Sequence, residues 1–172
     1  MSMRNLPWFA IVLLAPTVFG QEGPGLGEPV DEETLARIDF TVLPNGDGLP
    51  AGGGTAREGA DVYATHCIAC HGEGGEGAVN DALVGGHGTI GTDSPKKTVG
   101  SYWPYATTIF DYVRRAMPLQ TPGTLSADET YAVTAYLLHL NGIVDDDERM
   151  DAESLPDVKM PNRDGFTWGW AP

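Results

Sequence analysis

The stretch ATHCIACHGEGG, from Ala64 to Gly75, contains both cysteines of this chain of 172 residues. Cys67 and Cys70 are three residues apart, and His71 follows directly. Two cysteines placed at random in a chain with four histidines would give this order on the order of once in a few thousand sequences. The pattern therefore indicates a chemical role. Three kinds of site use such a pair: a reducible dithiol, a zinc site and a site of covalent haem attachment.

The first 20 residues are expected to form a secretory signal peptide. Arg4 gives a basic start, and an apolar run of fourteen residues, LPWFAIVLLAPTVF, follows it. A membrane span needs about 20 apolar residues, and no second run of this kind follows in the sequence. We expect cleavage before Gln21, export to the periplasm and a mature chain with no membrane span. Retention of the segment as an anchor is the alternative.

The net charge is strongly negative. The chain has 10 Lys and Arg against 24 Asp and Glu, a formal charge of −14, and cleavage would remove Arg4 and leave −15. Nucleic acid phosphates would be repelled by such a chain, so nucleic acid is not an expected partner. A positively charged protein partner or simple solubility would account for the charge.

Local patterns divide the mature chain into three regions. Residues 21–54 are acidic and rich in Gly and Pro, with one helical candidate at 31–38. Residues 55–142 are expected to form a helical domain, and residues 143–172 an extended strap or docking arm. No segment alternates convincingly as a strand, and the fold class is therefore predicted to be all-α.

Helix boundaries can be read from capping and breaking residues. TARE (55–58) and SADE (126–129) are capping boxes that open two helices, of which the first runs into the cysteines. The segment 106–116 is a further helix that ends at Met117, because Pro118 disfavours helical geometry at the preceding residue. The last helix is expected to stop at Asn141 and Gly142.

Two of the three kinds of site fit the cysteine pair poorly. A thioredoxin-like dithiol follows a strand in a βαβ frame, whereas this pair follows a helix in a chain without evident strands. A zinc site needs four ligands. The fourth would have to be His66, His87 or His139, and none of these is paired at finger-like spacing.

Haem attachment fits the pair. Two thiols about one helical turn apart can add across the two haem vinyl groups, and an imidazole directly after them then lies beneath the iron. Attachment of this kind takes place outside the cytoplasm, in agreement with export. We predict one covalent haem c, bound through Cys67 and Cys70 with His71 as the proximal ligand.

Met117 is the leading candidate for the distal ligand. It follows a helix and lies far enough downstream for the chain to pass around the haem edge. Met160 and His87 are the alternatives. Met150 lies in an acidic run expected to be exposed, His66 is beside the attachment site and cannot reach the opposite face, and His139 is expected to be a core or surface residue. With both axial positions filled no substrate can bind the iron, so we expect electron transfer and no catalytic residue.

The chain resembles class I cytochromes c in two stretches, GADVYATHCIACHG (59–72) and LSADETYAVTAYLLHLN (125–141). They are similar to the first and last helices of that fold. The resemblance implies that Gly59 and Tyr63 meet Tyr136 where the two helices cross, and that Met117 is the axial methionine. The expected architecture is thus a class I cytochrome c fold with extended N- and C-terminal segments.

A narrower resemblance covers most of residues 45–166. Its most specific segments are VGSYWPYATT (99–108) and MPNRDGF (160–166), similar to the cytochrome c subunit of periplasmic sulfite or sulfane-sulfur dehydrogenases of the sulfur-oxidising (Sox) type. It implies electrons arriving from a molybdenum-cofactor subunit and leaving to an acceptor such as another cytochrome or an oxidase. The chain departs from some relatives in having a single haem motif, and its end, TWGWAP, has no match. A free soluble periplasmic shuttle between respiratory complexes is the alternative.

Aromatic and basic residues in and just before the helix expected at 106–116 are further candidates for contacts with a haem. Tyr102, Trp103 and Tyr105 are expected at the haem edge, where propionates need hydrogen-bond donors, or in the core. Arg114 and Arg115 are expected to neutralise a propionate or the end of their helix dipole.

Overall fold

The structure, a computed structural model, describes residues 26–167 and 169 and divides into two units, residues 1–38 and 39–172. The first unit contains α1 (Glu32–Ile38), which confirms the helix expected there. Asp31 caps it by accepting hydrogen bonds from the Thr34 backbone N–H (2.7 Å) and hydroxyl (3.1 Å). The expected signal peptide lies outside the described residues. Within them, no helix is both long and apolar enough to cross a membrane.

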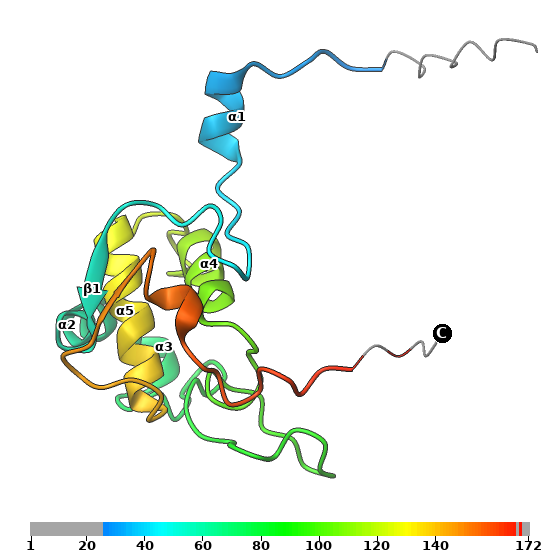
Figure 1. Cartoon of the computed structure of the whole chain (residues 1–172). Helices are drawn as coiled ribbons and strands as arrows, with labels where there is room; N and C mark the ends of the chain where they lie inside the picture. The colour runs from blue at the N-terminus through cyan, green and yellow to red at the C-terminus, as the bar shows by residue number, and fades with distance from the viewer. Residues whose placement is uncertain (1–25, 168, 170–172) are drawn as a thin grey trace, which may run out of the picture. The chain divides into compact units, whose positions relative to one another are not determined.

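The regular elements of the second unit are mainly helices. They are α2 (Ala56–His66), α3 (Ile68–His71), α4 (Ala106–Ala116) and α5 (Ala127–Leu140). Figure 1 shows α5 running through this unit, with α2 and β1 on one side of it and α4 on the other. Both predicted capping boxes are present, at Thr55 with Glu58 and at Ser126 with Glu129. The expected all-α class holds for these elements.

A close crossing of α2 and α5 organises the core. Gly59 lies against the backbone of Ala132, so closely that a Cβ at position 59 would overlap the Ala132 carbonyl. Beside it the rings of Tyr63 and Tyr136 pack with centroids 5.3 Å apart. The contact of Gly59 and Tyr63 with Tyr136, implied by the resemblance, is therefore confirmed.

A short antiparallel ladder corrects the expectation that the chain has no strands. β1 (Gly53–Thr55) pairs with β2 (Arg149–Asp151), with Gly54 opposite Met150. Three-residue strands, one with two glycines, are too short to show alternation in the sequence. Met150, expected to be exposed, is completely buried. The expectation was wrong because the neighbouring charged residues of a strand point to the opposite face.

The tail completes the core of the second unit. After β2 a 3₁₀ turn, η1 (Leu155–Asp157), follows, and the side chains of Leu155 and Met160 are both buried. They belong to the same cluster as Phe110 of α4 and Tyr131 of α5, whose rings lie 4.4 Å apart. Residues 150–160 are therefore part of the folded unit.

Gly59→Ala tests the helix crossing. The added methyl group would meet the Ala132 carbonyl, a backbone atom that cannot rotate away, and we expect a loss of about 3 kcal/mol in the free energy of unfolding. Denaturant unfolding of the purified protein measures it. Gly74→Ala is the control, because its Cβ would meet only the Glu76 carboxylate at 3.5 Å. Equal stability of the two variants would contradict the crossing.

Candidate haem site

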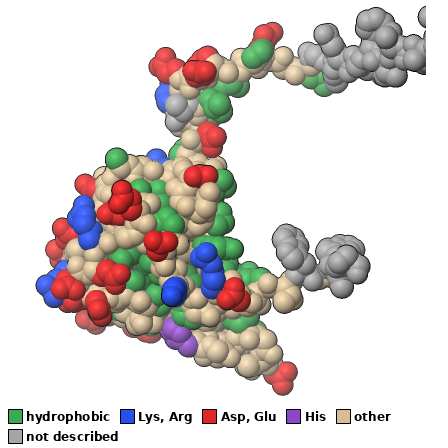
Figure 2. Space-filling model, in the orientation of Figure 1, with side chains coloured by type: hydrophobic (Ala, Val, Ile, Leu, Met, Phe, Trp, Pro, Cys, Tyr) green, Lys and Arg blue, Asp and Glu red, His purple; other side chains and the backbone are tan. Residues whose placement is uncertain are grey.

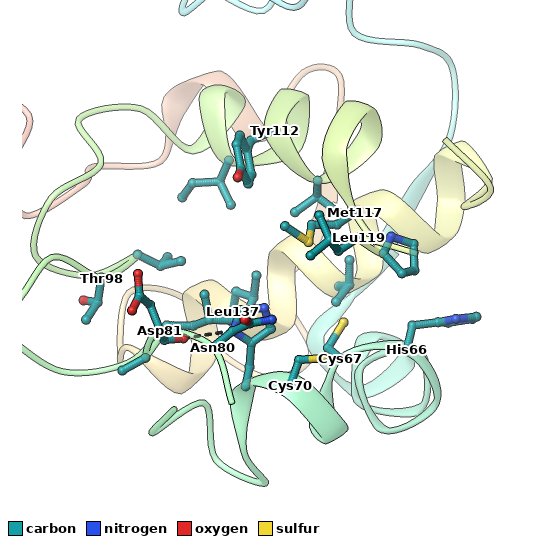
Figure 3. A pocket seen from close by; sticks show the side chains of 18 of the residues that line it. His66, Cys67, Cys70, Asn80, Asp81, Thr98, Tyr112, Met117, Leu119 and Leu137 are labelled. Carbon is teal, nitrogen blue, oxygen red and sulfur yellow. Dashed lines mark hydrogen bonds between the residues drawn. The ribbon is translucent and has the colours of Figure 1, made fainter. Parts of the chain in front are cut away.

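A cavity of about 500 Å³ lies between the cysteine segment and α4. Cys67, Cys70 and His71 line it together with residues of α4 and Met117. Figure 3 shows Cys67 and Cys70 across the space from Met117. The volume of the cavity falls within the range of about 300–1,000 Å³ that is usual for small-molecule and cofactor sites. The cavity therefore brings together all four of the residues that the sequence analysis assigned to a haem.

The chain breaks its helix at the first cysteine. The sequence predicted one helix running into the cysteines, but α2 ends at His66 and the single-turn α3 starts at Ile68. Helical hydrogen bonding resumes at once, because the Cys67 carbonyl accepts from the backbone N–H groups of Cys70 (3.1 Å) and His71 (3.0 Å). Both thiols project toward the cavity, and the His66 ring, which also lines the cavity, is directed away from the two thiols (Figure 3).

A backbone carbonyl orients His71. Its Nδ1 lies 2.9 Å from the carbonyl oxygen of Asp81. A carbonyl can only accept a hydrogen bond, so Nδ1 carries the proton and Nε2 keeps its lone pair available to a metal. Sequence reasoning missed Asp81, since a backbone carbonyl has no residue-type signature.

The environment of Cys67 differs from that of a reactive redox thiol. Burial, followed by the neighbouring Cys70, raises the pKa of Cys67 to about 11, whereas reactive thiols have a lowered pKa. In the part of the chain that the structure describes, no three His, Cys, Asp or Glu side chains are placed to hold a metal ion.

The opposite wall is mostly apolar and comes from α4 and α5. Ile109 and Val113 of α4 and Leu137 of α5 line it. Met117 follows the last turn of α4 in extended conformation and projects into the space across from the cysteines (Figure 3). Such a lining keeps water from a buried group and supplies a thioether as a soft ligand.

The competing distal ligands do not line this cavity. Met160 is buried in the core, and His87 lies beside Gly100. His139 has its Nδ1 3.2 Å from the Val144 carbonyl. Met117 is thus the candidate that the structure places across from the cysteines.

Only one of the aromatic and basic residues that the sequence analysis proposed near a haem lines the cavity. Trp103 lines the cavity, but Tyr102 and Tyr105 do not. Arg115 pairs with Asp111, and Arg114 lies over the Phe40 ring, 5.4 Å from its centroid. Neither arginine lines the cavity, which favours the other expected role, at the C-terminal end of the helix dipole of α4. Lys97, which the sequence analysis did not single out, does line the cavity.

Asn141 holds the loop that forms one edge of the cavity. Its Nδ2 donates to the carbonyls of Leu137 (2.8 Å) and Leu83 (3.2 Å), and its Oδ1 accepts from the Gly85 N–H (3.2 Å). Leu83 lines the cavity, and Asn141 is buried. The predicted helix stop is therefore also a clamp between α5 and the loop.

The chemistry of the lining fits a haem. Two thiols lie one turn apart, an imidazole nitrogen is free, a thioether faces them and the remaining walls are largely apolar. Covalent attachment of a haem needs the two thiols, and six-coordinate iron needs the imidazole and the thioether as its two axial donors.

Comparison with known proteins agrees with this chemistry. Residues 56–141 match the family model for cytochrome c. A chain in the crystal structure of the sulfane dehydrogenase SoxCD from Paracoccus pantotrophus is 43% identical, with a TM-score of 0.79, over 84% of this chain and 71% of that chain. Fold and site together define a class I c-type cytochrome. The chain belongs to the cytochrome c family, whose members transfer electrons through covalently bound haem c.

Asn141→Ala tests the loop clamp. The change removes the partner of the half-buried Gly85 N–H and of the Leu137 carbonyl, and one of the two donors to the Leu83 carbonyl, which also accepts from the Val99 N–H, so we expect a loss of about 2 kcal/mol in the free energy of unfolding. Thermal unfolding followed by circular dichroism measures it. Asn45→Ala, at an exposed turn, should cost less than about 0.5 kcal/mol. If the Asn141 hydrogen bonds do not stabilise the fold, the unfolding curves of Asn141→Ala and Asn45→Ala will be similar.

Proposed function

We propose that the cavity holds one haem c, attached through Cys67 and Cys70, with His71 and Met117 as axial ligands. The observation that carries this assignment is the placement of Met117 across the cavity from the cysteine segment. When bound, the haem supplies a one-electron couple at its iron.

The residues around the cavity suit electron transfer. The Asp81 carbonyl holds His71 in the tautomer that leaves Nε2 free. A Met117 thioether bound to the iron would favour the reduced metal, would raise the reduction potential and would leave no position for a substrate. Ile109, Val113 and Leu137 exclude water. This arrangement supports a carrier of single electrons that has no catalytic residue of its own.

We further propose that the chain is the electron-accepting subunit of a periplasmic molybdenum-dependent sulfite or sulfane-sulfur dehydrogenase. The 43% identity to a chain of the SoxCD sulfane dehydrogenase supports this role. Residues 1–20 would direct export, and the electrons would pass on to another cytochrome or an oxidase.

Co-purification from the native host tests the partner. A gently tagged full-length protein is isolated from the periplasm, and the eluate is assayed for molybdenum and for haem reduction by sulfite and by a sulfane-sulfur compound. We expect molybdenum in the eluate and substrate-dependent reduction. A haem protein that elutes alone and stays oxidised would instead favour the free periplasmic shuttle.

Met117→Ala tests the distal ligand. Covalent haem should remain, because both thiols are intact, while the reduction potential should fall and carbon monoxide should bind without competition. A spectroelectrochemical titration and a carbon monoxide binding spectrum measure these changes. Met160→Leu is the matched control, since Met160 is buried but does not line the cavity. A wild-type spectrum for Met117→Ala would remove it as a ligand.

A further inference from the structure

The two sequence segments with the most specific resemblance pack on each other. The Asn162 Nδ2 donates a hydrogen bond of 2.8 Å to the Tyr102 carbonyl. The Phe166 ring meets the Tyr102 ring edge to face, with centroids 5.4 Å apart and planes at 87°. The tail thus covers part of the segment before α4 and creates a surface that neither segment has alone. We call the surface made by Lys97, Tyr102, Tyr105, Arg163 and Phe166 the tail surface.

Two cations of the tail surface stack on aromatic rings. The Arg163 guanidinium carbon lies 4.3 Å from the Tyr105 ring centroid, and the Lys97 Nζ lies 5.3 Å from that of Tyr102. Ion pairs among the described residues join Arg57 with Asp146 and Arg115 with Asp111. Neither Lys97 nor Arg163 takes part in either of these two ion pairs. Both charges are therefore available to another molecule.

The tail surface borders the cavity. Lys97 lines the cavity, and so does Trp103, whose ring lies 6.2 Å from that of Tyr102. Tyr112 extends the same aromatic group, 5.8 Å from Trp103, and its side chain is 47% exposed. A protein bound here would lie beside the proposed haem.

The composition of the tail surface is that of a protein interface. Aromatic residues and arginine are enriched where the binding energy of interfaces concentrates, and Phe166 is 53% exposed. By contrast, acidic side chains are spread over the part of this unit that carries α2 and β1 (Figure 2), and the whole chain has a charge of −14. Unpaired cations in such a chain select a partner of opposite local charge.

We propose that the tail surface docks the molybdenum-cofactor subunit, through an apolar patch on that subunit flanked by Asp and Glu side chains. This rests on the proposed function, since it names the face by which that subunit delivers electrons. Phe166 would supply buried apolar contact, and Arg163 would meet a carboxylate while keeping its stacking on Tyr105.

Two tail variants test the proposal in the holoprotein. Arg163→Glu and Phe166→Ala change residues that do not line the cavity, and the haem spectrum and potential report whether the site is intact. Affinity for the purified molybdenum subunit is measured by titration at low and high salt. We expect each variant to bind about tenfold more weakly or worse. The salt dependence of wild-type binding should be reduced in Arg163→Glu.

The control is Arg57→Glu, which makes the same change of charge at the start of α2, where no residue lines the cavity. It should bind like the wild type. If the wild type binds the molybdenum subunit and the tail variants bind equally well, the docking surface is overturned while the proposed function stands. If the wild type does not bind that subunit at all, both fail.

Discussion

The approach of α2 to α5 at Gly59 is the constraint on which the rest of the structure depends. The contact is backbone against backbone, so neither helix can shift without breaking it. Tyr63, one turn further on, packs its ring against Tyr136 and donates its hydroxyl to the Gly72 carbonyl at 2.8 Å. That single side chain thereby connects the helix crossing to the residue that follows His71. The position of the imidazole is set by packing in the core.

The cavity itself is shaped largely by irregular backbone. Residues 72–100 carry no helix or strand, yet they supply the carbonyl that orients His71 and the edge held by Asn141. Backbone groups suit this task, because they keep their place whatever side chain the loop carries. Apolar walls from α4 and α5 complete the enclosure. Rigid helices thus set the size of the site, while the loop sets the polarity and direction of its donors.

The sequence predicted what is encoded locally and missed what depends on distant partners. The capping boxes at Thr55 and Ser126 were readable because a cap bonds to a backbone group three residues away. The cysteine pair was readable because covalent chemistry demands its spacing. The ladder at Met150 was not, since its burial depends on a strand almost a hundred residues earlier. The contact of the Asp81 carbonyl with His71 could not be predicted for a related reason, because only the folded loop brings the two residues together.

The burial of Met150, Leu155 and Met160 has a consequence for the order of events in biosynthesis. A chain is made from its N-terminus, so Cys67 and His71 emerge well before the residues that close the core. Until those last side chains arrive, β1 has no partner strand and the cluster around Phe110 is incomplete. The thiols are therefore made before the core beside them can be completed, and residues 150–160 supply its last side chains.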